Sequence, residues 1–440
     1  GSQNCGRTMD LNQEMLRIHN VNADTIRTGQ NPLMASMSLA DLRNVYQSQI
    51  YPNRYYNGLA QISARQPTSL TSVDATGKVG SVGFYVSGQY TGDPGSVKFY
   101  KGSTQRRGRV NLDYNARSDL RISVSTMYDN FYRDNRGVAN IFGALFRGQL
   151  PGINLLARDS MKSAAFPDGR LMIQRQNFRP TDNGNAFPLY DGENRTNDQT
   201  SNRFLGSLSA KYFPAGWVTF EANFGYDNRS NNSQSIAPKG YRTSGLSSSF
   251  NNGNLSLANS RDEALNAGLS ATFRQKFATD LSGKFRVAGN YDQEKFIASN
   301  GSGEVFNVKE IYTLDNLTAN QAVGSSSLII KNLGYSAAGT MEFKDRYVLD
   351  ASIRRDGSSL FGPGHRWATF NRIAGVWIVN REPFWKVGFM DELRLRASRG
   401  TAGATPRFDA QYETFSVGTT GISTGRAGNE GLAPETTTEY

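Results

Sequence analysis

From about Val79 onward, apolar and polar residues alternate along the chain with a period of two. In the segment 81–90, one face carries apolar side chains and one glycine, at Val82, Phe84, Val86, Gly88 and Tyr90. The other face, which Tyr85 interrupts, is small or polar at Ser81, Gly83, Ser87 and Gln89. Successive side chains of a strand point to opposite faces, so this alternation predicts β-strands that are apolar on one face only.

The alternating segments come in pairs that are joined by short turns. The pairs are 107–116 with 120–129, 204–212 with 218–227, 265–273 with 281–291, and 333–343 with 347–353. Turns are predicted between members of these pairs, at 117–118, 214–216 and 344–345. The whole pattern predicts roughly eleven or twelve strands, most about as long as the 9–11 residues that a tilted membrane strand requires.

Two further features favour a membrane barrel over a soluble sandwich. Aromatic residues recur at strand ends beside the turns, as an interfacial girdle requires, at Tyr114, Tyr128, Tyr212, Tyr226, Phe343 and Tyr347. The connections alternate between short turns and long segments, the latter at about 133–200 and 230–260. The long segments contain stretches rich in Asn, Ser and Gly, at 181–203 and 228–259, which are predicted to be solvated loops.

The N-terminal part of the chain has a different character. Residues 1–75 lack sustained alternation and are predicted to be mostly irregular, apart from a short helix at 34–46 that Ser38 would cap. Residues 76–440 are predicted to form the N-terminal and middle part of a β-barrel that is incomplete at its C-terminus. The chain starts at Gly1, with no initiator methionine and no signal-peptide core.

These observations predict an all-β fold, an antiparallel transmembrane β-barrel with long extracellular loops. We expect this chain to be an internal piece with roughly half of the strands of such a barrel. A half-barrel has two open edges whose unpaired backbone groups are costly in lipid, so the piece alone is not expected to form a stable pore.

Composition excludes several other classes of protein. Only 38% of the 440 residues are hydrophobic and the mean hydropathy is -0.53, so no stretch approaches the ~20 apolar residues of a membrane helix. Cys5, His19 and His365 are the only cysteine and histidines, too few for a Cys/His zinc site or a Cys-His dyad. The net charge of +11 comes from scattered basic residues, which suit a lumen wall better than a nucleic-acid partner.

The candidate catalytic and metal-binding residues are each explained better by a structural role. Gly421–Gly425 matches G-x-S-x-G but lies in a Gly/Thr-rich loop without a strand-to-helix elbow. Two carboxylate pairs, Glu221 with Asp227 and Asp350 with Asp356, suit a polar lumen wall. Five residues could supply oxygen ligands to a calcium ion, but their spacing does not follow the order of an EF-hand loop. They are Asp182, Asn183, Asn185, Asp191 and Glu193.

Aromatic residues in the long loops are candidates for stacking on sugars, because loops are where ligands usually bind. They are Phe166, Phe178, Phe187 and Tyr190. We nevertheless predict no catalytic, cofactor-binding or metal-binding residue, and the substrate-binding residues stay unassigned. The protein is predicted not to be an enzyme and to need no cofactor.

The later part of the chain resembles the SusC/RagA-type TonB-linked outer-membrane transporters. The resemblance spans about 79–440 and is strongest in the last hundred residues. Its motifs are RDGSSLFG (Arg355–Gly362), the strand around Trp377, NREPFW (Asn380–Trp385), LRLRASRGTAG (Leu393–Gly403) and NEGLAPETTTEY (Asn429–Tyr440). Near the front, FYVSGQYTGDPG (Phe84–Gly95) followed by RGRVNLDYN (Arg107–Asn115) is similar to the family's early hairpin.

This resemblance implies import of oligosaccharides, peptides or similar nutrients across the outer membrane of a Gram-negative bacterium. The implied partners are outer-membrane lipids, a SusD-like surface lipoprotein that acts as a lid, and TonB. TonB would act through a plug domain missing from this chain, and a glycan or peptide would be the substrate.

Two alternatives stay open. One is a siderophore-type TonB-dependent receptor, which the late motifs disfavour. The other, from a different class, is a soluble or surface-displayed β-rich binding module or adhesin.

Overall fold

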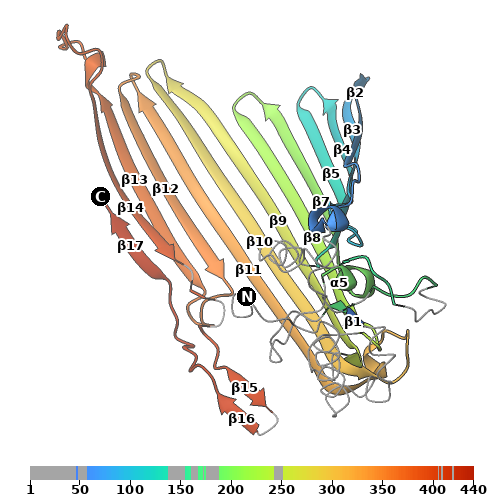
Figure 1. Ribbon diagram of the computed structural model, residues 1–440. Helices are drawn as coiled ribbons and strands as arrows, with labels where there is room; N and C mark the ends of the chain where they lie inside the picture. The colour runs from blue at the N-terminus through green and yellow to red at the C-terminus, as the bar shows by residue number, and fades with distance from the viewer. Residues whose placement is uncertain are drawn as a thin grey trace, which may run out of the picture.

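The computed structural model describes residues 46–47, 57–136, 154–159, 167–171, 173–174, 188–241, 251–404, 406–407, 410–418 and 421–440. Its dominant feature is one antiparallel sheet of 13 strands, in which almost every strand pairs with the next one along the chain (Figure 1). The predicted all-β antiparallel fold is therefore confirmed.

The sheet consists of β2 (Ser69–Val79), β3 (Val82–Asp93), β4 (Ser103–Arg117), β5 (Leu120–Asp134), β7 (Thr196–Ala215), β8 (Val218–Ala237), β9 (Asn254–Ala278), β10 (Leu281–Phe306), β11 (Leu317–Phe343), β12 (Tyr347–Ser358), β13 (Trp367–Ile378), β14 (Arg394–Ala404) and β17 (Glu435–Glu439). The edge strands are β2 and β17, and β17 pairs with β14. The sheet is not closed, as in a partial barrel.

Smaller elements lie mostly in the long connections, at the end of the sheet opposite the short turns (Figure 1). They are the parallel pair β1 (Tyr46–Gln47) and β6 (Ile173–Gln174), the hairpin β15 (Phe415–Gly418) with β16 (Gly421–Thr424), the α-helices α3 (Gly58–Ile62) and α5 (Pro188–Asn194), and the 3-10 helices η2 (Leu314–Asn316) and η3 (Val379–Arg381). No helix in the described ranges is long and apolar enough to cross a membrane.

Strand register aligns the alternating residues into continuous rows across the sheet. One row runs through Phe84, Leu112, Val124, Leu208 and Phe224. The adjacent row runs through Asp113, Ser123, Ser209 and Asn223. Because a slip of one residue would mix these rows, the register keeps one face of the sheet apolar and the other polar. We call these the apolar face and the polar face.

Two belts of aromatic side chains cross the apolar face. The turn-side belt stacks near the short turns, with ring centroids 6.0–6.4 Å apart in the pairs Tyr212–Phe220, Trp217–Phe273, Phe273–Phe285, Phe343–Tyr347 and Tyr347–Trp377. The loop-side belt comprises Tyr128, Phe204, Tyr226, Tyr335 and Trp367. All six aromatic residues predicted for a girdle lie on this face.

The distance between the belts fits a membrane. On β7 they are marked by Phe204 and Tyr212, and eight residues of strand span roughly 26 Å at about 3.3 Å per residue. The apolar band of an outer-membrane barrel is about 25 Å tall. Because barrel strands tilt by about 35–45°, the length along β7 corresponds to roughly 20 Å of height, so the apolar face between the belts comes close to the height of a lipid-facing band.

The central strands are longer than the alternation predicted. Strands β7 to β11 have 20 to 27 residues each, and the connections shrink to 135–195 and 238–253. The predictions of loop at 196–203, at 228–237 and at 254–259 are therefore wrong. Beyond the loop-side belt both faces of the sheet are largely polar. The alternation of apolar and polar residues is therefore lost there, although the ladder of backbone hydrogen bonds continues.

The start of the sheet also differs from the prediction. Strand β2 begins at Ser69, before the boundary expected at residue 76, and it brings the sheet to 13 strands instead of eleven or twelve. Its side chains are exposed on both faces, which leaves a weak periodic signal. The helix predicted at 34–46 lies outside the described residues, except for Tyr46 in β1.

The predicted hairpin turn at 344–345 is confirmed. Lys344 and Asp345 both have positive φ, 52° and 54°. Positive φ at both central residues is the signature of a type I′ turn, whose twist matches that of the flanking strands. This geometry sets the register of β11 on β12.

The two faces make opposite predictions for neighbouring residues of β7. Leu208, midway between the belts, points to the apolar face, and Ser209 points to the polar face. In the full-length protein in lipid vesicles, Leu208→Arg should lower the free energy of unfolding by about 2–4 kcal/mol, because it places a charge in lipid. Ser209→Arg is the matched control and should change it little. Equal losses in urea titrations would contradict the assignment of the faces.

Candidate functional site: the polar face and the loop cluster

The polar face carries a chequerboard of amide or carboxylate side chains and glycines over five strands. One row is Asn223, Gly268, Asn290, Gly334 and Asp356. The next is Gly225, Asn266, Asp292, Asn332 and Ser358. Both rows line a hollow of about 730 Å³ that extends from β7 to β14. The hollow offers many hydrogen-bond donors and acceptors at a single surface.

Contacts within the hollow hold its polar groups in place. The Asn266 Nδ2 donates to Asp292 Oδ1 at 2.7 Å, and Arg354 Nε donates to Asp356 Oδ1 at 2.6 Å. A Cβ on Gly334 would lie 2.8 Å from Asp356 Oδ1, so glycine at 334 makes room for that carboxylate. The side-chain amides retain further hydrogen-bonding capacity, because each has two donors and two acceptor lone pairs.

The predicted carboxylate pairs lie on the polar face, each with a protein partner. Glu221 faces Lys211 Nζ at 3.0 Å, and Asp227 accepts from Arg203 Nε at 2.9 Å. Asp350 accepts from the Thr340 hydroxyl at 2.6 Å. These contacts join adjacent strands, which agrees with a polar wall rather than with acid–base chemistry.

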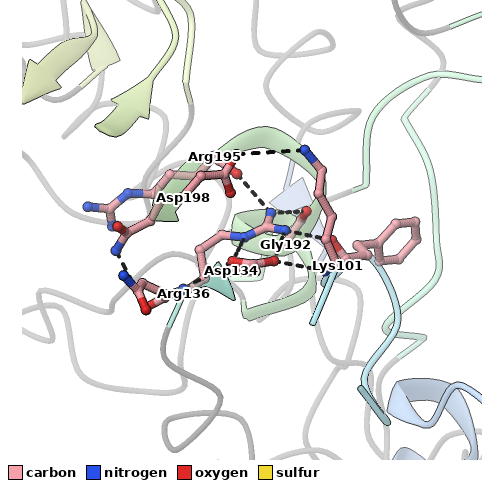
Figure 2. A network of polar contacts seen from close by, with 9 residues as sticks. Lys101, Asp134, Arg136, Gly192, Arg195 and Asp198 are labelled. Carbon is pink, nitrogen blue, oxygen red and sulfur yellow. Dashed lines mark hydrogen bonds and ion pairs between the residues drawn. The ribbon is translucent and has the colours of Figure 1, made fainter. Parts of the chain in front are cut away.

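Beyond the loop-side belt, Arg136 ties three segments together (Figure 2). Its Nε donates to Asp134 Oδ1 at 2.8 Å, and only 7% of the Arg136 side chain and 1% of the Asp134 side chain are exposed. Its terminal nitrogens donate to the carbonyl oxygens of Phe99 at 3.0 Å, Arg195 at 2.8 Å and Gly192. One guanidinium thus joins the β3–β4 connection, the end of β5 and the end of α5.

We call Arg136, Asp134, Lys101, Tyr100 and Arg195 the loop cluster. The guanidinium carbon lies 4.8 Å from the ring centroid of Tyr100, and burial raises the pKa of Tyr100 to about 12. Burial also acts to raise the pKa of Asp134. Hydrogen bonds from Arg136 and from the Lys101 N–H, at 2.8 Å, outweigh that effect and hold the pKa below its usual value. The cluster is therefore a charged, buried pair with its hydrogen bonds satisfied.

A second set of contacts ties α5 to the β8–β9 connection. The rings of Tyr190 and Tyr241 meet edge to face at 5.2 Å, and the Tyr241 hydroxyl donates to Asp191. Glu193 pairs with Arg158 at 2.7 Å. Tyr190 is fully buried, so its prediction as a sugar-stacking residue is wrong. The other aromatic candidates, Phe166, Phe178 and Phe187, lie outside the described residues.

Two proposed calcium ligands, Asp191 and Glu193, are engaged by the protein contacts above, and Asp182, Asn183 and Asn185 lie outside the described residues. In the described part of the chain, no group of three His, Cys, Asp or Glu side chains could hold a metal ion. The G-x-S-x-G sequence forms β16 of a hairpin and not a strand-to-helix elbow.

Comparison with known proteins decides the family. Residues 158–440 match the family described as TonB dependent receptor-like, beta-barrel. The chain belongs to this family. Members form a class of outer-membrane receptors and are not an enzyme family.

Individual relatives agree with this membership and with the SusC/RagA resemblance. TonB-dependent receptor P39 of Formosa agariphila is 27% identical over 330 residues, which are 73% of this chain and 29% of that protein. TonB-dependent receptor SusC of Bacteroides thetaiotaomicron is 34% identical over 110 residues, 22% of this chain and 11% of that protein. The structure of the RagAB peptide transporter superposes with a TM-score of 0.64 at 16% identity.

The coverage of these relatives is partial. The match to RagAB covers 95% of this chain and 48% of that chain. The chain thus spans about a third or less of the curated relatives and about half of the RagAB chain it resembles in fold.

In this TonB-dependent receptor, two of the family motifs contact each other. The N–H of Gly362, which ends RDGSSLFG, donates to the Leu432 carbonyl of NEGLAP at 3.2 Å. A Cβ on Gly362 would lie 1.8 Å from the Glu430 carbonyl oxygen, so only glycine permits this approach. These motifs therefore join two connections at the loop side.

The NREPFW motif lies at the turn side, and its Glu382 binds three side chains, a group of contacts that we call the hub. Glu382 accepts hydrogen bonds from the Tyr347 hydroxyl at 2.6 Å, the Trp377 indole at 3.0 Å and Arg346 Nη1 at 2.5 Å. The bonds from Tyr347 and Trp377, with the Arg346 charge, lower the pKa of Glu382. The hub thus fixes two rings of the turn-side belt and the turn between β11 and β12.

The loop cluster should depend on Arg136. Arg136→Met leaves Asp134 charged and buried without its partner, which should cost about 3–5 kcal/mol locally. The amides of Lys101 and Arg195 should then exchange faster with deuterium in the full-length protein. Arg133→Met, at an exposed site of β5 beside Asp134, is the control. Unchanged exchange in Arg136→Met would contradict the role of the cluster.

The hub should make stability depend on acid pH. The pKa of Glu382 is lower in the folded state, so its stabilisation is present above the unfolded carboxyl pKa of about 4.3 and is lost as pH falls through the folded value. Glu382→Gln should be less stable than the parent at pH 7, and the difference should shrink at acid pH.

Thermal unfolding at several pH values checks this. Glu413→Gln, at an exposed site on the loop side, is the control and should have the stability of the parent. A difference between Glu382→Gln and the parent that stays constant with pH would refute the role of the charge.

Proposed function

We propose that the protein containing this chain imports polar nutrients, oligosaccharides or peptides, across the outer membrane of a Gram-negative bacterium. The main support for this function is the sheet with two different faces. One face has an apolar band between aromatic belts, and the other has an amide-rich hollow. A wall of this kind separates lipid from a polar passage. Membership of the TonB-dependent receptor family supports the same conclusion.

The chemistry of the hollow favours solutes that hydrogen-bond. Asn223, Asn266, Asn290 and Asn332 present amides, which are neutral and both donate and accept, as sugar hydroxyls and peptide bonds require. Asp292 and the Arg354–Asp356 pair add charged groups to this set. One similar structure is described as a peptide transporter, and that likeness supports a peptide as one of the two substrate classes.

The proposed partners follow from the two ends of the sheet. A SusD-like lipoprotein would close the passage from the loop side, where the contacts of the loop cluster hold the connections together. A plug domain would occupy the polar face and transmit the action of TonB. Residues 1–75 would be the linker after the plug or an early loop, and residues 76–440 would form the first and middle part of the barrel, with β2 starting slightly earlier.

A soluble binding module or adhesin is the competing class. Its weakness is the apolar face, where large side chains are exposed to an extent that water disfavours, among them Phe224, Leu269, Leu349 and Ile353. The full-length gene product should fractionate with outer membranes and show heat-modifiable mobility in gels. A soluble monomer would overturn the proposal.

Binding of a substrate in the hollow can be tested directly. Full-length protein is incubated with a pool of oligosaccharides and tryptic peptides, and bound species are identified by mass spectrometry and then titrated by calorimetry. Asn266→Ala should weaken binding about tenfold, as expected for one lost hydrogen bond to a buried ligand. Asn111→Ala, on the polar face but outside the hollow, is the matched control. Equal affinity in all three proteins would contradict a substrate role for the hollow.

A further inference from the structure

A hollow of about 810 Å³ lies on the apolar face, within the band between the two belts. Its floor consists of residues with small side chains, at Ala210, Ala222, Ala271, Gly289 and Ala337. Its rim consists of large side chains, with Tyr212 and Phe220 on the turn side and Tyr335 and Ile353 on the loop side. The lining is almost entirely apolar, so the hollow has the shape and polarity to hold hydrocarbon chains.

One cation borders this hollow. Arg355 lines it and lies directly across from Tyr335 in the register of β11 and β12. Its guanidinium carbon is 5.3 Å from the ring centroid of Trp367, which itself stacks on Tyr335 at 6.1 Å. Arg355 therefore sits at the loop-side belt, where the polar headgroups of a membrane begin.

Within the described part of the chain, the charge of Arg355 is not neutralised by a carboxylate. Among the described residues, no carboxylate forms an ion pair with it, and the neighbouring Asp356 pairs instead with Arg354 on the polar face. Between the belts, β7 to β12 direct no other charged side chain of the described chain to the apolar face. A solitary cation at the headgroup level, held against a ring above an apolar hollow, is complementary to a lipid with an anionic head.

We propose that this hollow binds a phosphorylated, multiply acylated glycolipid of the outer leaflet. Acyl chains would occupy the hollow, and a phosphate would accept hydrogen bonds from the Arg355 guanidinium, whose planar fork matches phosphate oxygens. The loop-side position of Arg355 assigns the ligand to the outer leaflet, because long loops of such barrels are extracellular. This inference rests on the membrane orientation in the proposed function.

The test uses the full-length protein extracted in mild detergent, with lipid A as the probe and a zwitterionic phospholipid as the comparison. Native mass spectrometry measures binding of each lipid. Arg355→Gln should bind lipid A about tenfold more weakly, because one charge-assisted contact is lost, and should bind the zwitterionic lipid as before. Ala337→Leu fills the floor and should weaken lipid A binding without changing the charge.

Arg399→Gln is the matched control. Arg399 also points to the apolar face and lies over a ring, that of Tyr440, but does not border the hollow. Lipid A binding that is equal in the parent, Arg355→Gln and Ala337→Leu would show unselective annular lipid and overturn the proposal. A dimer that Ala337→Leu dissociates would assign the hollow to a second copy and overturn it as well.

Heat-modifiable mobility of each variant confirms folding. Its absence from the parent would instead count against the proposed membrane function, so the two failures are distinguishable.

Discussion

Backbone N–H and C=O groups at membrane depth have no water to bond to, and each must find a partner in a neighbouring strand. In this chain the antiparallel ladder from β2 to β14 and β17 meets that demand, and every other feature depends on it. The ladder fixes a register, and the register with a side-chain period of two separates an apolar face from a polar one. Both hollows and both belts are consequences of that separation.

The same ladder continues past the membrane. Strands β7 to β11 extend beyond the loop-side belt as a wall with polar residues on both faces. The wall brings connections that are far apart in sequence to one level, where Arg136 and Tyr241 join them. The loop geometry that substrates and partners would meet is therefore set by buried polar contacts together with buried apolar side chains such as Leu155, Leu171 and Leu189.

The family motifs have a structural explanation. Glu382 of NREPFW connects two aromatic rings and a turn at one membrane interface, and Gly362 of RDGSSLFG lets two connections touch at the other side. NREPFW does not line the hollow of the polar face, whereas RDGSSLFG contributes Asp356 to Ser358 and Phe361 to its wall. The amides of that hollow belong to no motif, which fits a surface that would differ between members with different substrates.

The sequence by itself determined the fold class, the pairing of hairpins, the turn at 344–345, the faces of the strands and the aromatic girdle. Each depends on neighbours in sequence: a period of two, a turn signal, or an aromatic residue beside a turn. Only the tertiary structure decided the lengths of β7 to β11, the burial of Tyr190, the partners of Asp191 and Glu193, and the two hollows. Those depend on cross-strand register and on contacts between distant loops, which local alternation does not encode once both faces are polar.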